Sequence, residues 1–165
     1  MSTEAVLRDA TVLDFPAIVA LNAAQVQHTS VMDEARLAHL HAMAAYHRVA
    51  IVKGEVAAFL LAFREDAPYR NDNHGWFKAR YPRFFYVDRI VVGPAGAGLG
   101  LGSVLYRDLF ARSNADGLPL ICCEYNVEPP NEPSRRFHDK FGFHEVGSQW
   151  LDGGKKKVSL QIAEA

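Results

Sequence analysis

The chain has few cysteines, no long hydrophobic run and no excess of charge of either sign. Only two of its 165 residues are cysteines, and 18 basic residues stand against 19 acidic ones. No apolar run approaches the roughly 18 residues that a bilayer span needs, and the first residues lack the basic-then-apolar pattern of a secretion signal. The balanced charge gives no indication of a nucleic-acid surface. These absences predict a cytoplasmic globular protein without membrane or nucleic-acid partners.

The two cysteines, Cys122 and Cys123, are adjacent within a predicted strand. Successive side chains of a strand point to opposite faces, so we expect no disulfide between them, which fits a reducing compartment. Neither is accompanied by a base that would activate a nucleophilic thiolate. The length suits a single domain over residues 1–165, with 49% hydrophobic residues to build one core.

The pattern of apolar residues, prolines and glycines predicts helices and strands in mixed order. Helices are expected at 14–27, 33–46 and 134–141, and from the glycine-rich turn to about 115; strands are expected at 48–52, 55–63, 84–92, 118–127, 143–150 and 155–162. Asp14 is predicted to cap the first helix. Residues 64–82 are polar and aromatic together and are predicted as a long loop, a type of segment that is often functional.

The segment 91–106 contains a buried strand end, five glycines within ten residues and the start of a helix. Glycine permits positive φ and close approach of a ligand to the main chain. The first turn of a helix carries unpaired N–H groups and a partial positive charge that favour an anion. The segment therefore predicts a site for a phosphate-bearing cofactor. The alternative is a glycine-rich surface turn before an ordinary helix.

The glycine spacing excludes two common phosphate-binding motifs. No Lys follows any of the glycines of this segment as a P-loop requires, and the sixth position of a G-x-G-x-x-G fingerprint would be Leu101 or Ser103. The run 98–102, Gly-Leu-Gly-Leu-Gly, resembles the acetyl-CoA pyrophosphate loop of the GNAT family of N-acetyltransferases, usually written Arg/Gln-x-x-Gly-x-Gly/Ala. Ala97 stands at the Arg/Gln position, which leaves main-chain N–H groups to bind the pyrophosphate.

A second segment, 131–143, extends this resemblance. Asn131, Gly142 and Phe143 match the GNAT pattern, and His138 stands where the family usually has a Tyr. Residues 6–11 and 14–16 are similar to the family's first strand and the start of its first helix. The resemblance covers essentially the whole chain. It implies an α/β fold with a mixed, mostly antiparallel central sheet, flanked by helices and splayed to hold acetyl-CoA as co-substrate.

The resemblance also assigns the cofactor-binding residues to the strand end, the glycine-rich loop and the second segment. They are Ile90, Val91, Val92, Ala97, Gly98, Leu99, Gly100, Leu101, Gly102, Ser103, Asn131, Phe137 and His138. In the family, a main-chain N–H at the position of Val92 meets the thioester carbonyl and would polarise it.

Acetyl transfer also needs a base for the amine and a proton for the departing thiolate. Alternation along 84–92 places Tyr86 and Asp88 on one face. Asp88 is the first candidate base, and the alternative is that it pairs with a nearby Arg or caps a loop. Glu124 on the neighbouring strand is the second candidate. His138 takes the place of the Tyr that protonates the CoA sulfur in relatives, and a pKa of about 6.5 would suit that role. The alternative is a histidine that caps or packs on the helix surface.

Four aromatic residues, Tyr69, Trp76, Phe77 and Tyr86, are predicted to bind the acceptor, and a homodimer contact is the alternative for the first three. The predicted activity is acetyl-CoA-dependent transfer of an acetyl group to a primary amine of a small-molecule or amino-acid-like acceptor. Two alternative functions are left open: the protein acetylates proteins or peptides, or it is a non-catalytic module that binds acyl-CoA. His39 and His41 do not share a helix face, so no metal site is predicted.

Overall fold

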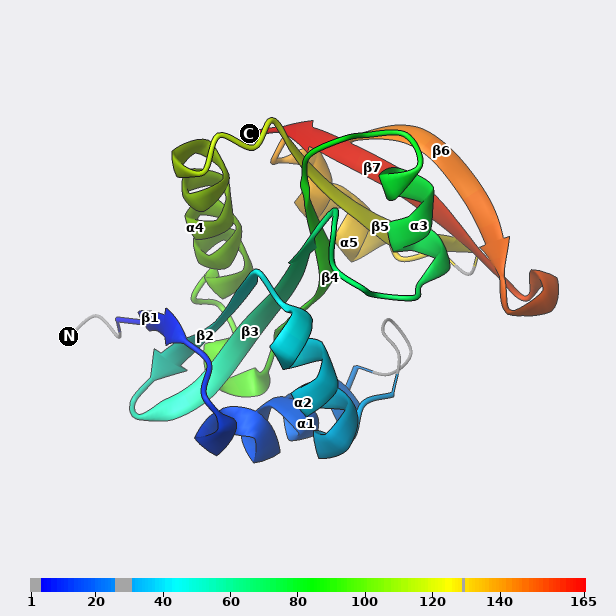
Figure 1. Ribbon diagram of the computed structural model, residues 1–165. Coiled ribbons are helices and arrows are strands. Elements are labelled where there is room, and N and C mark those ends of the chain that lie inside the picture. Colours follow the sequence, from blue (N-terminus) through cyan, green and yellow to red (C-terminus); the bar gives the residue numbers. More distant parts are fainter. Residues whose placement is uncertain (1–3, 26–30, 129) are drawn as a thin grey trace. The chain divides into compact units, whose positions relative to one another are not determined.

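The computed structural model describes residues 4–25, 31–128 and 130–165 (Figure 1). Its strands form a seven-stranded sheet in the order β1-β2-β3-β4-β5-β7-β6. The pairs β1–β2, β2–β3, β5–β7 and β6–β7 are antiparallel, and β4–β5 is parallel. The predicted mixed, mostly antiparallel sheet is therefore confirmed. The chain clusters into two compact units, Met1–Phe63 with Val87–Arg112 and Arg64–Tyr86 with Ser113–Ala165.

The first unit consists of a sheet region covered by helices. Its elements are β1 (Val6–Asp9), α1 (Phe15–Ala23), α2 (Glu34–Met43), β2 (Tyr46–Val52), β3 (Glu55–Arg64), most of β4 (Phe85–Val92) and most of α4 (Leu101–Ala115). The helices α1 and α2 contact each other, and both contribute fully buried residues to the core, among them Ile18 and Leu37. The hairpin turn at Lys53 and Gly54 has positive φ at both residues, the form that matches the twist of paired strands.

The second unit contains the start of β4 together with α3 (Asp72–Lys78), β5 (Leu120–Glu128), α5 (Glu132–Asp139), β6 (His144–Leu151) and β7 (Lys156–Glu164). The strand pairing of two neighbouring β7 residues, Ser159 and Leu160, shows on which faces of the sheet region α5 and α3 lie. Tyr125, which contacts His138 of α5, pairs with Ser159, and Gly147, which contacts Trp76 of α3, pairs with Leu160. Since neighbouring strand residues face opposite ways, α5 and α3 cover opposite faces of this sheet region.

Most predicted elements are found, with two corrections. The predicted loop 64–82 contains the helix α3, and the predicted helix 33–46 ends at Met43 because Tyr46 begins β2. The described part of the first helix ends at Ala23, and residues 26 and 27, which the prediction included, lie outside the described residues. The expected absence of a disulfide between Cys122 and Cys123 is confirmed, and both residues are buried. Within the described ranges, no helix has the length and apolar character needed to span a membrane.

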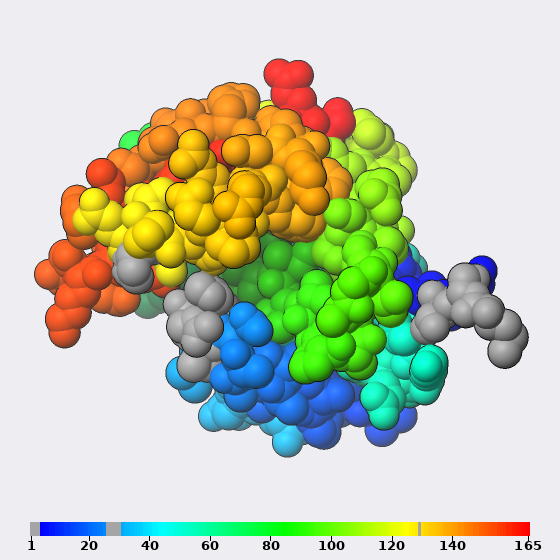
Figure 2. Space-filling view, turned by 180° about the vertical axis from the view of Figure 1, so that it is seen from behind, coloured from blue at the N-terminus to red at the C-terminus, as the bar shows by residue number. Residues whose placement is uncertain are grey.

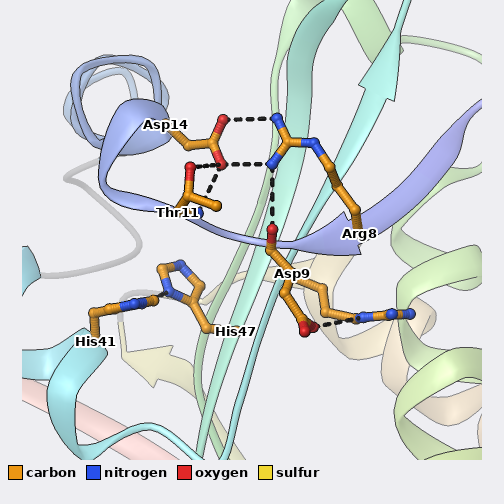
Figure 3. A network of polar contacts seen from close by, with 7 residues as sticks. Arg8, Asp9, Thr11, Asp14, His41 and His47 are labelled. Carbon is orange, nitrogen blue, oxygen red and sulfur yellow. Dashed lines mark hydrogen bonds and ion pairs between the residues drawn. The ribbon is translucent and has the colours of Figure 1, made fainter.

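Asp14 lies at the predicted cap position of α1, but its side chain does not cap that helix. Its carboxylate accepts two hydrogen bonds from the Arg8 guanidinium, at 2.7 and 2.8 Å, and one from the Thr11 N–H at 2.8 Å (Figure 3). These bonds lower the pKa of Asp14 to about 2, with the Arg8 hydrogen bonds as the largest cause. The carboxylate therefore ties β1 to the turn before α1 instead of capping the helix.

A pair of histidines lies in the same unit. The Nδ1 atoms of His41 on α2 and His47 on β2 are 2.7 Å apart (Figure 3). His47 is 7% exposed, and its Nε2 has no hydrogen-bond partner among the described residues. Burial, followed by the nearby His41, lowers the pKa of His47 to about 4. The folded chain therefore keeps this imidazole neutral where an unfolded chain would protonate it.

This difference predicts an acid-sensitive stability. Below the ordinary value of 6.5 the unfolded chain binds a proton at His47, while the folded chain does not until about pH 4, so stability falls as the pH is lowered through this window. Between pH 7 and 5 we expect His47 to account for about 2 kcal/mol of lost unfolding free energy. Denaturant unfolding should show that the unfolding free energy of His47→Gln depends less on pH between 7 and 5 than that of the wild type. The exposed His39 gives the matched control His39→Gln, and parallel curves for the wild type and His47→Gln would contradict the prediction.

Candidate active site

The glycine-rich loop of the first unit follows β4 directly. A 3-10 turn at Pro94–Gly96 leads to Gly98 and Gly100, which have φ of +76° and +67°, and α4 begins at Leu101. The N–H of Val104 donates to the Gly100 carbonyl at 3.1 Å and closes the first turn. The N–H groups of the preceding turn residues, Leu101, Gly102 and Ser103, therefore point beyond the helix end.

The loop is open to an approaching ligand. Residues 97–100 are exposed and lie at the surface in Figure 2, in bright green. A Cβ added at Gly98 or Gly100 would meet no atom within 4 Å, whereas one at Gly96 would lie 2.4 Å from the Leu101 side chain. Positive φ, open space and the first-turn N–H groups of a helix fit the predicted binding of a pyrophosphate.

The predicted base Asp88 lies on β4 of the same unit, in an ion pair. Its Oδ2 is 2.7 Å from Nε of Arg89, and the two side chains are 4% and 3% exposed. Arg89 also donates to the Asn22 side chain of α1 at 3.2 Å. The arrangement is the ion pair that the sequence left as the alternative for Asp88. Ile90 and Val92, farther along the strand, are only partly buried, and Val91 is buried.

The second candidate base, Glu124, lies on β5 of the second unit. Its two carboxylate oxygens accept hydrogen bonds from the Tyr86 hydroxyl at 2.9 and 2.7 Å. Glu124 is partly buried, whereas Tyr86 is fully buried. The structure thus joins two predicted site residues that the sequence had assigned to different roles.

The helix α3 holds two of the four aromatic residues predicted to bind the acceptor, Trp76 and Phe77. Phe77 is fully buried and packs against Tyr86, with ring centroids 6.0 Å apart, so it is a core residue. The Trp76 ring covers Gly147 of β6, and the Arg80 guanidinium lies 3.9 Å from its centroid. Tyr69 is partly buried before the helix, with its ring near His74. Of the predicted group, Tyr69 and Trp76 retain accessible surface.

The helix α5 places Asn131, Phe137 and His138. The Asn131 side chain accepts a hydrogen bond from the Ser134 N–H at 3.4 Å and caps the helix. Asn131 also lines a groove of about 580 Å³ together with Tyr125 and Gln161, a volume within the usual range for small-molecule sites. Phe137 packs against Phe141, with centroids 5.4 Å apart. In Figure 2 this segment, yellow to orange, forms part of the surface.

The geometry does not favour the predicted acid role of His138. Its Nδ1 lies 2.7 Å from the main-chain oxygen of Ser134. A carbonyl oxygen only accepts, so Nδ1 carries the proton and Nε2 presents a lone pair in the neutral ring. Burial lowers the pKa of His138, which is 5% exposed. The neutral ring therefore has no second proton to give to a thiolate.

Sequence reasoning missed two residues, His74 in the second unit and Arg89 in the first. His74 is 1% exposed and packs against Tyr86, and Arg89 pairs with Asp88. Asn71 could have signalled α3, since an Asn often precedes a helix as its N-cap, and its side chain accepts from the N–H groups of Asn73 and His74. An ion pair with a nearby Arg was the alternative for Asp88, but strand alternation places Arg89 on the opposite face and gave no reason to choose it. The thiol of Cys122 remains unsuited to nucleophilic attack because burial raises its pKa.

Comparison with known proteins identifies the family to which this chain is similar. The model of the Acetyltransferase (GNAT) family matches residues 11–143, a range that includes the glycine-rich loop, Glu124 and His138. Phosphinothricin N-acetyltransferase of Streptomyces coelicolor is 39% identical over 67 residues, which are 41% of this chain and 37% of that protein. The matched part thus spans little more than a third of that relative.

Solved structures share the fold over nearly the whole chain. The ribosomal-protein-S18-alanine N-acetyltransferase from Escherichia coli superposes with a TM-score of 0.73 at 14% identity, covering 98% of this chain and 94% of that one. The acetyltransferase yncA from Salmonella typhimurium, solved with acetyl-CoA, gives 0.72 at 18% identity with the same coverage of 98% and 94%. At these identities the likeness shows the fold alone.

Proposed function

This chain belongs to the acetyltransferase (GNAT) family, acyltransferases that use acetyl-CoA, and on that premise we propose that it acetylates the primary amine of a small-molecule or amino-acid-like acceptor by direct transfer. The observation that carries the proposal is the contact between the Tyr86 hydroxyl and the carboxylate of Glu124, a residue that is only partly buried. A carboxylate in this state is suited to bind an ammonium group and accept its proton.

In this proposal, the glycine-rich loop binds acetyl-CoA. When bound, acetyl-CoA provides an activated thioester whose carbonyl carbon accepts the amine nitrogen as the C–S bond breaks. The main-chain N–H groups at Gly98, Gly100 and the first turn of α4 would bind its pyrophosphate. Ala97 offers no side-chain donor, so binding depends on the backbone of this loop.

Glu124 is the base we assign, in preference to Asp88. Both carboxylates accept strong hydrogen bonds, but the Asp88 side chain is 4% exposed and lies against the Arg89 guanidinium. An ammonium group would have to displace that partner and enter a buried position. Glu124 removes the proton from the acceptor nitrogen. The departing thiolate takes its proton from solvent, since the neutral His138 ring has none to give.

The similarity to phosphinothricin N-acetyltransferase favours a small-molecule acceptor. The segment shared with the phosphinothricin N-acetyltransferase is 39% identical over 67 residues, and the name of that relative denotes an amine-bearing small molecule as acceptor. The structural neighbours named for protein acceptors share only the fold.

The acceptor class can be tested with three groups of compounds under saturating acetyl-CoA. They are free amino acids and small primary amines, peptides with a free N-terminus, and N-terminally blocked peptides that contain lysine. We expect kcat/KM to be largest for members of the first group. Faster turnover of either peptide group would assign a peptide or protein acceptor instead.

A further inference from the structure

Tyr86 is fixed in place before any substrate binds. It has no exposed surface, and its ring packs against His74 and Phe77, with centroids 5.4 and 6.0 Å away. Parallel pairing sets Tyr86 opposite Cys122, so Glu124, two residues farther along β5, extends from the same face as Cys122. The ring position thus determines where the hydroxyl meets the carboxylate.

The hydroxyl contacts both carboxylate oxygens, at 2.7 Å to Oε2 and 2.9 Å to Oε1. A glutamate side chain has several rotatable bonds, and fixing them costs conformational entropy. A hydrogen bond to an ionised acceptor is strong enough to offset part of that cost. The hydroxyl has one hydrogen, which it shares between the two oxygens, so this contact restrains the position of the carboxylate group.

The helix α3 supports this contact through His74. The Nε2 of His74 lies 3.0 Å from the main-chain oxygen of Arg64, and since a carbonyl only accepts, Nε2–H is the donor. The His74 ring then stands edge-on to the Tyr86 ring, with planes at 77°. The Asn71 cap holds the His74 N–H at 3.1 Å. A continuous set of contacts therefore runs from the start of α3 to Glu124.

We propose that Tyr86 is a positioning residue that acts through Glu124. It orients the carboxylate for proton transfer without contacting the acceptor, and α3 maintains it through His74. This role differs from the acceptor-binding role predicted for Tyr86 from the sequence. The proposal rests on the proposed function, in which Glu124 is the base.

A double-mutant cycle tests the positioning role of Tyr86 separately from the assignment of Glu124 as the base. Tyr86→Phe removes only the hydroxyl, and we expect kcat to fall about tenfold, the effect of losing one hydrogen bond to a charged group, with the KM for acetyl-CoA unchanged. In a Glu124→Gln background the same substitution should change kcat by less than about twofold, since the carboxylate that Tyr86 orients is gone. A merely structural role would lower kcat equally in both backgrounds.

Tyr46→Phe is the matched control, because Tyr46 is also buried and its hydroxyl donates to a carboxylate, that of Asp108, at 2.7 Å. It should lower the melting temperature without a comparable loss of kcat. A wild-type kcat in Tyr86→Phe would overturn the positioning role, as would an equal loss in the Glu124→Gln background. A wild-type kcat in Glu124→Gln alone would instead overturn the assignment of the base on which the proposal rests.

Discussion

Replacing Glu124 with Gln is expected to lower kcat by about 10²-fold or more, the usual contribution of a positioned base. The substitution keeps the size of the side chain and an oxygen that can still accept from Tyr86, so the fold should survive. The affinity for acetyl-CoA should remain close to that of the wild type. Steady-state kinetics at saturating amine, combined with calorimetric titration of CoA, measures the two effects separately.

Asp88→Asn is the informative comparison for this prediction. The substitution leaves the Arg89 guanidinium, 3% exposed, without its ionised partner, and breaking a buried pair in this way costs about 3–5 kcal/mol. We therefore expect a large loss of unfolding free energy in Asp88→Asn and a modest one in Glu124→Gln. A stable Asp88→Asn with a 10²-fold lower kcat, next to an active Glu124→Gln, would return the role of base to Asp88.

Replacing Gly100 with Val is expected to weaken CoA binding by about 10²-fold, equivalent to roughly 3 kcal/mol. Gly100 has a φ of +67°, a conformation that disfavours residues with a Cβ by about 1–2 kcal/mol. The new side chain would also occupy the open space beside the loop and keep a phosphate from the N–H groups. Calorimetry of CoA binding measures the loss directly.

Gly54→Val is the matched control for backbone strain. Gly54 also has a positive φ, +79°, with nothing within 4 Å of an added Cβ, but it lies in the hairpin turn between β2 and β3. It should reduce stability and leave the CoA affinity unchanged. An unchanged affinity in Gly100→Val would show that this loop does not bind the pyrophosphate.

The sequence predicts the glycine-rich loop well because its chemistry is local. Positive φ at Gly98 and Gly100 and the helix start at Leu101 follow from residue types and spacing within ten positions. The helix α3 was missed because it has seven residues with Gly75 at its centre, too short and too polar for a helical period to be visible. Its stability comes from contacts distant in sequence, such as the 2.7 Å bond from Gln149 to Asn73.

For the catalytic candidates too, the sequence predicts what depends on neighbouring residues and misses contacts that depend on the folded structure. Strand alternation correctly places Asp88 among residues with some exposed surface on β4, but it separates Asp88 from Arg89, whose long side chain nonetheless reaches the carboxylate. The contact between Tyr86 and Glu124 depends on the register of β4 and β5, which are 38 residues apart at this point. Residue types alone suggested both as site residues, but the link between them required the paired strands.

The most direct test of the account is a balance of products over a single turnover. Enzyme in excess is mixed with acetyl-CoA and an accepted amine, and free CoA thiol, N-acetylated amine and the intact mass of the protein are measured over time. Direct transfer predicts equal amounts of CoA and acetylated amine, with no acetyl group on the protein at any time. Tight binding of acetyl-CoA without release of CoA, or an acetylated protein that forms and decays during turnover, would contradict it.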